Sequence, residues 1–303
     1  MGTSTGAQRP PRPDEVRAPG SRAQRLLPAK WHRVLRRGLF LLALLLVGLF
    51  AMQLAPRNPL RVVAADRLKA PGAVLRDGTI AVLGTDGVGR DVLSRIIAGA
   101  RLSLLIGLSS VAVAGALGTN LGLISGYFGG RIGDVIMRLV DIQMAFPALL
   151  LALAIAAALG PSVLTLVLAL GFSYWTSYAR LARGIVLSLK EKEYVLAATV
   201  CGASSARILF RHVLPNAVNP VMILASLHLG QMIIAEASLS YLGLGIQPPD
   251  ISWGGMIADG RNYLGSAWWA ATFPGVAIAV TVLIMGMFGD AVRDALDPKF
   301  RFH

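Results

Sequence analysis

The stretch that decides the fold is EYVLAATVCG, residues 193–202, followed by RILFRHVLPN, residues 207–216. It is a polar interruption in a chain that is otherwise mostly apolar. Ala197 and Ala198 favour a helix, Gly202 breaks it, and Pro215 ends a second short helix over residues 206–212. We therefore predict a helix, a turn and a helix. A small-residue helix flanked by charges suits docking in a groove on another protein, although an ordinary amphipathic loop has the same pattern.

The chain around this stretch is far more apolar than a soluble domain. Hydrophobic residues make up 55% of its 303 residues and charged residues 15%, whereas about 25% of a soluble domain is charged. The mean hydropathy is +0.63. This composition indicates an integral membrane protein that is surrounded by a lipid bilayer.

The net charge of +13 would suit a nucleic-acid partner, but the distribution of the charge does not. The basic residues flank apolar runs and lack the interleaved aromatic side chains of a single-strand binding surface. We therefore expect no nucleic-acid partner. The single cysteine, Cys201, excludes an intramolecular disulfide framework and shows no metal-ligand spacing.

The apolar runs predict an all-α membrane protein with six transmembrane helices. The N-terminal tail is basic and rich in proline, so we expect it to be disordered and cytoplasmic. Counting crossings from there also places the C-terminus in the cytoplasm. In chain order we expect a disordered tail at 1–32, a first helix at 33–55, an external segment at 56–101, a five-helix domain at 102–291 with a cytoplasmic loop at 183–215, and a cytoplasmic tail at 292–303.

The five helices of that domain are expected near five apolar runs. The runs are Leu102–Ile124, Pro147–Leu159, Ser162–Ala179, Val218–Leu244 and Trp268–Phe288. Small residues recur at every fourth position of the first of these helices, which lets another helix approach closely. The predicted packing stripe consists of Ser110, Ala114, Gly118, Gly122 and Gly126.

Three polar side chains lie in the run that begins at Val218. At 100° per residue, His228, Gln231 and Glu236 fall within an arc of roughly 140°. An ionised group at the centre of a bilayer costs on the order of 3 kcal/mol, and such groups usually face a bundle interior or water. Glu236 either lines a translocation path with the other two, or makes a hydrogen bond between helices.

Two other patterns suggest chemistry without supporting it. Residues 84–91, GTDGVGRD, nearly spell a phosphate-binding loop, but Arg90 replaces the lysine and Asp91 the hydroxyl that such a loop needs. Asp134 and Asp141 could form a carboxylate site, although Arg138 between them favours a helix-face ion pair. We therefore expect no catalytic residue, no metal site and no cofactor bound by this chain.

The opening stretch resembles the cytoplasmic "EAA" loop of ABC-importer inner-membrane permeases. Its Glu193-Tyr-Val-x-Ala-Ala and Arg-His-Val-Leu-Pro-Asn216 are similar to the dipeptide/oligopeptide/nickel family of binding-protein-dependent permeases. Leu83–Arg95, ahead of the second span, resembles the C-type member of the permease pair. Further matching segments are Glu236–Gly245, Pro248-Pro249, Ser252–Gly254 and Gly289–Pro298.

The resemblance implies a type-1 ABC-importer permease fold for residues 102–291, in a multi-pass subunit of the bacterial plasma membrane. It also implies partners: a second homologous permease in a heterodimer, two cytoplasmic ATP-binding subunits that use ATP and Mg²⁺, and an extracytoplasmic substrate-binding protein. Leu196 departs from the family pattern, which has an acidic residue there. The residues implied to couple to the ATPase are Glu193, Tyr194, Ala197, Ala198, Gly202, Leu214 and Pro215.

The function implied is import of di- or oligopeptides, with no enzymatic activity in this chain. Three alternatives stay open. The same machine could import nickel or another small solute, because the binding protein selects the cargo. The chain could be a secondary transporter. It could also be a membrane-embedded enzyme that uses Glu236 with Asp134 or Asp141.

Overall fold

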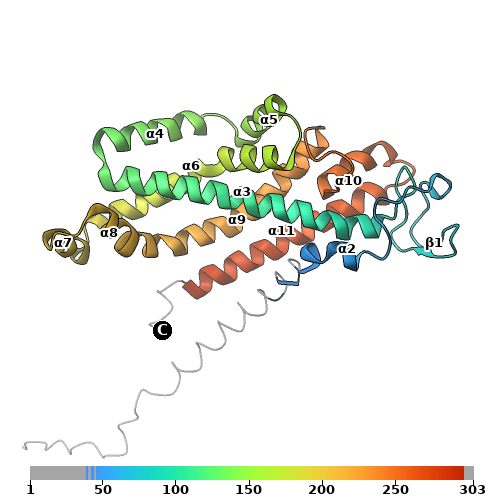
Figure 1. Cartoon of the computed structure of the whole chain (residues 1–303), viewed down its shortest axis with the longest axis horizontal. Helices are drawn as coiled ribbons and strands as arrows, with labels where there is room; N and C mark the ends of the chain where they lie inside the picture. The colour runs from blue at the N-terminus through green and yellow to red at the C-terminus, as the bar shows by residue number, and fades with distance from the viewer. Residues whose placement is uncertain (1–38, 40–41, 44–45, 297–303) are drawn as a thin grey trace, which may run out of the picture.

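The computed structural model describes residues 39, 42–43 and 46–296, without the side chains of residues 292, 295 and 296. Within this part, long helices lie side by side and short helices and loops gather at both ends (Figure 1). The expected tail at 1–32, residues 297–303 of the expected tail at 292–303, and much of the first helix lie outside the described residues, whereas residues 292–296 belong to the last helix. The end of that first helix, α2 (Ala51–Leu54), stops at Ala55, where the apolar run also ends.

The segment between α2 and the next long helix is compact. It contains the short helix η2 (Ala64–Asp66) and a hairpin of β1 (Ala73–Val74) and β2 (Ile80–Ala81), in which Ala73 pairs with Ala81. Helix α3 (Val92–Phe128) begins ten residues before the expected boundary at Leu102. The reason is its cap, because the Asp91 side chain accepts a hydrogen bond from the Ser94 N–H at 2.8 Å.

The expected third span is divided in two. Helix α4 (Gly130–Met144) and helix α5 (Ala148–Leu159) meet at an angle of 88°. Pro147 causes the break, since a residue before proline is disfavoured in a helix. The expectation that residues 147–159 alone cross the bilayer is wrong, because twelve helical residues rise only about 18 Å and the hydrocarbon core is about 30 Å thick.

Helix α6 (Val163–Lys190) continues eleven residues beyond the expected end at Ala179 and packs along α3. It leads into α7 (Glu193–Val200), α8 (Ser205–Ile208), the π-helical turn η3 (Leu209–Val213) and α9 (Leu214–Tyr241). After a loop come α10 (Trp253–Gly260), the turn η4 (Arg261–Tyr263) and α11 (Trp269–Leu296). In Figure 1, α7 and α8 lie at one end of the bundle and α10 and β1 at the other. We call these the α7 end and the α10 end.

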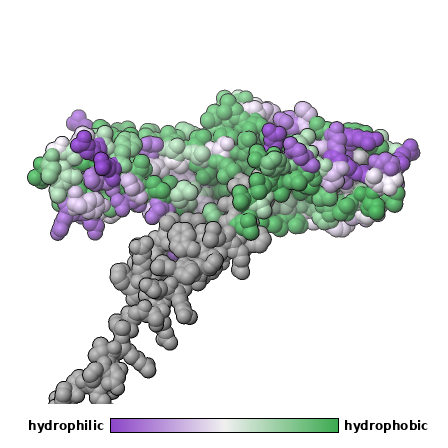
Figure 2. All heavy atoms as spheres, turned by 60° about the horizontal axis from the view of Figure 1, so that its bottom comes forward, coloured by the Kyte–Doolittle hydropathy of each residue, from purple (hydrophilic) through white to green (hydrophobic). Residues whose placement is uncertain are grey.

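Three of the described helical segments are long and apolar enough to cross a membrane: Val92–Phe128, Ser205–Tyr241 and Trp269–Ala291. A fourth is added if the bent pair α4 and α5 forms one span. The expected six are therefore not reached within the described residues. Helix α6 is long enough to cross a membrane but is not one of these segments, and its second half contains Arg180 and Arg183. Hydrophilic residues gather towards the two ends, with a largely hydrophobic surface between them (Figure 2).

Candidate functional site

The α7 end presents a short helix that is almost detached from the bundle. Its inner face is anchored by one buried side chain, Val195, which belongs to a small apolar cluster with Leu123 and Val186 of the long helices and Ile208, Leu209 and Val213 after the turn. The rest of α7 is largely exposed, including Leu196 at 51% and Val200 at 88%. These two side chains lie four positions apart and hence on one face. The helix therefore offers a surface for protein contact.

The turn after α7 is built on Gly202, whose φ is +78°. The N–H of Ala203 donates to the carbonyl of Ala198 at 3.0 Å, and the N–H of Gly202 donates to that of Thr199 at 3.0 Å. This pair of bonds is the glycine-terminated helix end known as a Schellman motif. Ser204 then caps α8 by accepting from the Arg207 N–H. The expected helix, turn and helix are present.

The expectation that Pro215 stops the second helix is wrong. The helix runs without interruption from Ser205 to Tyr241, and Pro215 lies in the first turn of α9. The π-helical turn at Leu209–Val213 lies directly before α9, and local π-helical adjustment is one way in which a membrane helix accommodates a proline. Of the residues implied to couple to an ATPase, Glu193, Tyr194, Ala197, Gly202 and Pro215 are exposed, and Ala198 and Leu214 are half-buried.

The small-residue stripe of α3 lies against α6, the helix that carries α7. A Cβ atom added to Gly118 would lie 2.1 Å from the Trp175 carbonyl oxygen, and one added to Gly122 would lie 2.3 Å from that of Ala179. Gly126 lies against Val186, and Ser110 and Ala114 are also buried. The two helices therefore touch at backbone distance, so that α6 is held firmly along α3.

The three polar residues of α9 do not lie together. Gln231 is exposed, whereas His228 and Glu236 are buried. The His228 ring lies edge-on between Tyr174 and Tyr178, at 5.7 and 5.0 Å between ring centroids. Glu236 accepts a hydrogen bond from the Ser240 hydroxyl at 2.7 Å with Oε1, and its Oε2 has no partner among the described residues. Both interpretations of Glu236 stay open.

The acidic pair of α4 forms a different contact from the expected one. Asp141 accepts a hydrogen bond from Arg180 of α6 at 2.7 Å, whereas no ion pair of Arg138 with Asp134 or Asp141 is found in this described helix. The carboxylate of Asp141 therefore links α4 to α6. Among the residues that the structure describes, no group of three or more His, Cys, Asp or Glu side chains could hold a metal ion.

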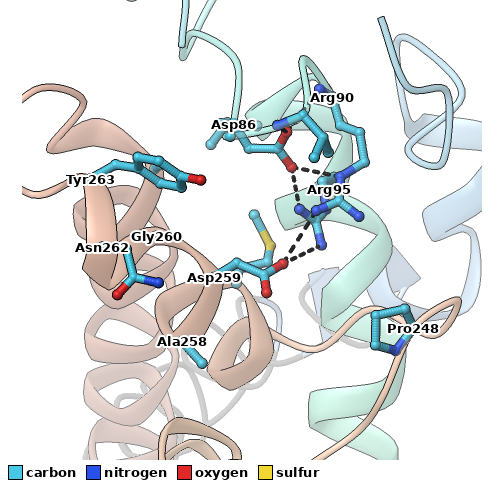
Figure 3. Close-up of a pocket in the computed structure, with 14 residues that line it drawn as sticks. Asp86, Arg90, Arg95, Pro248, Ala258, Asp259, Gly260, Asn262 and Tyr263 are labelled. Atoms are coloured by element: carbon cyan, nitrogen blue, oxygen red, sulfur yellow. Dashed lines mark hydrogen bonds and ion pairs between the residues drawn. The ribbon is translucent and has the colours of Figure 1, made fainter. Parts of the chain in front are cut away.

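Residues 84–91 form part of a pocket at the α10 end that sequence reasoning did not predict. The pocket has a volume of about 310 Å³, and Figure 3 shows its charged side chains facing one another. Asp86 Oδ2 accepts from Arg90 Nε at 2.6 Å and from Arg95 Nη1. Asp259 Oδ2 accepts from Arg90 Nη2 at 3.2 Å and from Arg95 Nη2 at 3.4 Å. Two arginines are thus held between two carboxylates.

These charges shift the acidity of Asp86. Burial alone would raise the pKa of Asp86, but the Arg95 and Arg90 guanidinium groups and the N–H groups of Arg90 and Val88 outweigh burial and lower that pKa. The glycines of this segment serve packing, since a Cβ on Gly89 would lie 1.9 Å from the Val63 carbonyl oxygen. The only sequence signal for the pocket was the alternation of charge at Asp86, Arg90 and Arg95, because Asp259 lies far away in the chain.

Comparisons with known proteins identify relatives of the chain. The family described as "Binding-protein-dependent transport system inner membrane component" matches residues 118–302. The chain is 44% identical, over 87% of both chains, to the di/tripeptide transport system permease protein DppC of Pseudomonas aeruginosa. It is 41% identical to the glutathione transport system permease protein GsiD of Pectobacterium atrosepticum, over 89% of this chain and 90% of that one.

A solved structure shows the same fold. A chain of the methionine ABC transporter MetNI, in an inward-facing conformation, superposes with a TM-score of 0.53 and 17% identity, covering 67% of this chain and 96% of that chain. The family match covers more than half of the chain, and the first relative shares 44% of its residues over most of both lengths. The chain therefore belongs to the family of binding-protein-dependent transport system inner membrane components.

Proposed function

We propose that this chain is the permease subunit of a bacterial ABC importer for peptides, in which ATPase subunits drive transport by pushing on α7. The proposal includes a second homologous permease, two ATP-binding subunits that hold ATP and Mg²⁺, and an external binding protein that delivers the peptide. The subunit is expected to lie in the plasma membrane and to have no enzymatic activity of its own.

The observation that carries the proposal is the attachment of α7. One buried side chain, Val195, anchors the helix to the bundle, while α6 and α9 continue from its two sides. A partner that gripped α7 would therefore displace two long helices at once. Because α6 is packed at backbone distance on α3, such a displacement would move these helices as rigid bodies.

The charges around α7 support a cytoplasmic position for that end. Lys190, Lys192, Arg207 and Arg211 lie there against Glu191 and Glu193, and basic flanks are retained in the cytoplasm. The α10 end would then face outward, where a binding protein arrives. We expect only the partner subunits to hydrolyse ATP. The space beside the glycines of residues 84–91 is occupied by other residues of this chain, and the segment would lie on the outer side of the membrane, so it is not available to bind phosphate.

A surface for the second permease is available on α4. Its exposed apolar side chains recur at helical spacing, and they are Ile132, Val135, Leu139 and Ile142. Either the second permease or lipid would cover such a face.

Peptides are the proposed cargo because relatives at more than 40% identity are named for dipeptide, di/tripeptide and glutathione transport.

The test replaces Gly202 by valine in the assembled importer. We expect Gly202→Val to reach the membrane and the ATPases to keep hydrolysing ATP, while uptake of a labelled dipeptide falls at least about tenfold. Valine is strained at a φ of +78°, so the angle between α7 and α8 must change. The control is Gly184→Val in α6, where an added Cβ would meet no atom within 4 Å. Normal uptake by Gly202→Val would contradict the coupling role of this turn.

A further inference from the structure

We propose that the pocket at the α10 end is a binding site for the carboxylate terminus of a peptide, and that Asp259 occupies the place of that carboxylate when no peptide is bound. The proposal rests on the proposed function for the identity of the ligand. It adds a site on the permease itself, at the end of the bundle proposed to face outward. Four features of the pocket carry it.

The two carboxylates of the pocket are held very differently. Asp86 is 5% exposed and contacts Arg90 Nε at 2.6 Å as well as Arg95 Nη1. The side chain of Asp259 is 49% exposed, and a single oxygen of it meets the two arginines at 3.2 and 3.4 Å. Charge-assisted N–H···O bonds normally measure about 2.7–2.9 Å. Asp86 is therefore a fixed part of the site, whereas Asp259 makes long ion pairs that the carboxylate of a ligand can replace.

The arginines retain unused capacity for an anion. Arg95 is 4% exposed and lines the pocket, and its Nε has no hydrogen-bond partner among the described residues. Without Asp259, the two guanidinium groups face only the single charge of Asp86, so the cluster carries one net positive charge. Two adjacent guanidinium groups with free N–H donors match the geometry of a carboxylate.

The size and the opposite wall also suit a short peptide. A volume of about 310 Å³ is at the lower end of the range for small-ligand sites, about 300–1,000 Å³. Figure 3 shows the Tyr263 hydroxyl and the Asn262 amide across the open space from Asp86 and Asp259. Tyr263 accepts a hydrogen bond from Arg67 at 3.2 Å. The amide of Asn262 and the hydroxyl of Tyr263 are groups that can pair with a peptide backbone.

The ion pairs of Asp259 connect two separate parts of the fold. Asp259 lies on α10, whereas Arg95 lies in the first turn of α3 and Arg90 lies just before that helix. A carboxylate that replaced Asp259 would remove the ion pairs between these two elements and leave Asp86 in place. Arrival of a peptide would then release α10 from α3 at that point.

The experiment uses the complete importer without its binding protein, in lipid nanodiscs, with alanyl-alanine as the probe and alanyl-alanine amide as the ligand that lacks a carboxylate. Saturation-transfer NMR titration measures both affinities. We expect the amide to bind at least about tenfold more weakly, the loss that follows from removing charge-assisted hydrogen bonds. Equal binding of the two probes would overturn the proposal.

Two variants separate this site from a structural ion-pair cluster. Asp259→Asn removes the competing charge with almost no change in shape, so alanyl-alanine should bind several-fold more tightly to it than to the unaltered protein. Arg90→Gln should weaken binding at least about tenfold, while Arg138→Gln, an exposed arginine of α4, should leave it unchanged. Unchanged or weaker binding by Asp259→Asn would show that Asp259 does not hold the place of the ligand.

Uptake in cells separates failure of this site from failure of the proposed function. If labelled dipeptide is not taken up but alanyl-alanine binds through its carboxylate, the proposed cargo is wrong and the site stands. If uptake is normal and Asp259→Asn does not strengthen binding, the cargo stands and the site is wrong.

Discussion

Asp86 binds two arginines with one carboxylate, so a change at this residue is expected to lower stability at the α10 end. Asp86→Asn leaves Arg90 and Arg95 with only the long contacts to Asp259. Breaking a buried pair from one side costs about 3–5 kcal/mol. We expect a large fall in the thermal unfolding temperature of the purified protein, compared with Asp77→Asn on the exposed hairpin turn.

The same residue predicts a pH dependence. The pKa of Asp86 is lower in the folded protein than its ordinary value of 3.8, so its contribution is complete above that value. The contribution is lost as pH falls through the lower pKa of the folded state. The difference in unfolding temperature between the unaltered protein and Asp86→Asn should therefore be constant from pH 7 to pH 5 and shrink below about pH 4. A difference that stayed constant down to pH 2 would contradict this assignment.

Leu196 is a residue at which this chain departs from the loop pattern that the resemblance implies, and its side chain is exposed on α7. An exposed leucine beside exposed Val200 suits an apolar wall on the partner better than a basic one. We expect Leu196→Glu to reduce co-purification of the ATPase subunits at least about fivefold, because a carboxylate would be desolvated without a partner. Leu187→Glu, at an exposed leucine of α6, is the matched control, and equal loss in both variants would refute a specific contact.

At the scale of elements, the contact between α3 and α6 allows a sharp comparison of two glycines in one helix. A Cβ on Gly118 would lie 2.1 Å from a carbonyl oxygen, whereas the nearest atom to a Cβ on Gly115 is a Tyr178 ring carbon at 3.7 Å. Gly118→Ala should therefore destabilise the protein by about 1–3 kcal/mol. Gly115→Ala should stabilise it by up to about 1 kcal/mol, because alanine is the better helix former. Thermal unfolding in detergent measures both, and shifts of the same sign would contradict the geometry.

The elements also show what the sequence could and could not predict. Apolar runs and the spacing of small residues indicated most of the long helices and the face on which α3 packs, since both follow from local periodicity. Boundaries were less accurate, because the Asp91 cap starts α3 early and a π-helical turn carries the helix past Pro215. The pocket depends on Asp259 meeting Arg90 and Arg95 across 169 and 164 positions, respectively. No local pattern contains that contact.

At the scale of the whole molecule, the two hydrophilic ends must lie on opposite sides of the membrane if ATPase subunits bind and move α7. Cys201, the only cysteine of the chain, is exposed at the α7 end. A membrane-impermeant maleimide should therefore label it in inside-out vesicles but not in intact cells. The matched variant replaces Cys201 by serine and Asp77, on the exposed hairpin turn at the α10 end, by cysteine. This variant should be labelled in spheroplasts and not in inside-out vesicles.

Labelling of Cys201 also reports the docked partner. Cys201 follows α7 directly, next to the most exposed apolar side chain of that helix, Val200. If the ATPase subunits cover α7, they should slow the modification of Cys201 at least about tenfold in the assembled importer, because a group buried in an interface is withdrawn from solvent. Leu196→Glu should restore the rate measured for the isolated permease. Labelling of Cys201 in intact cells would show that the α7 end faces outward. A labelling rate that is the same in the complex and in the isolated permease would place the coupling contact elsewhere.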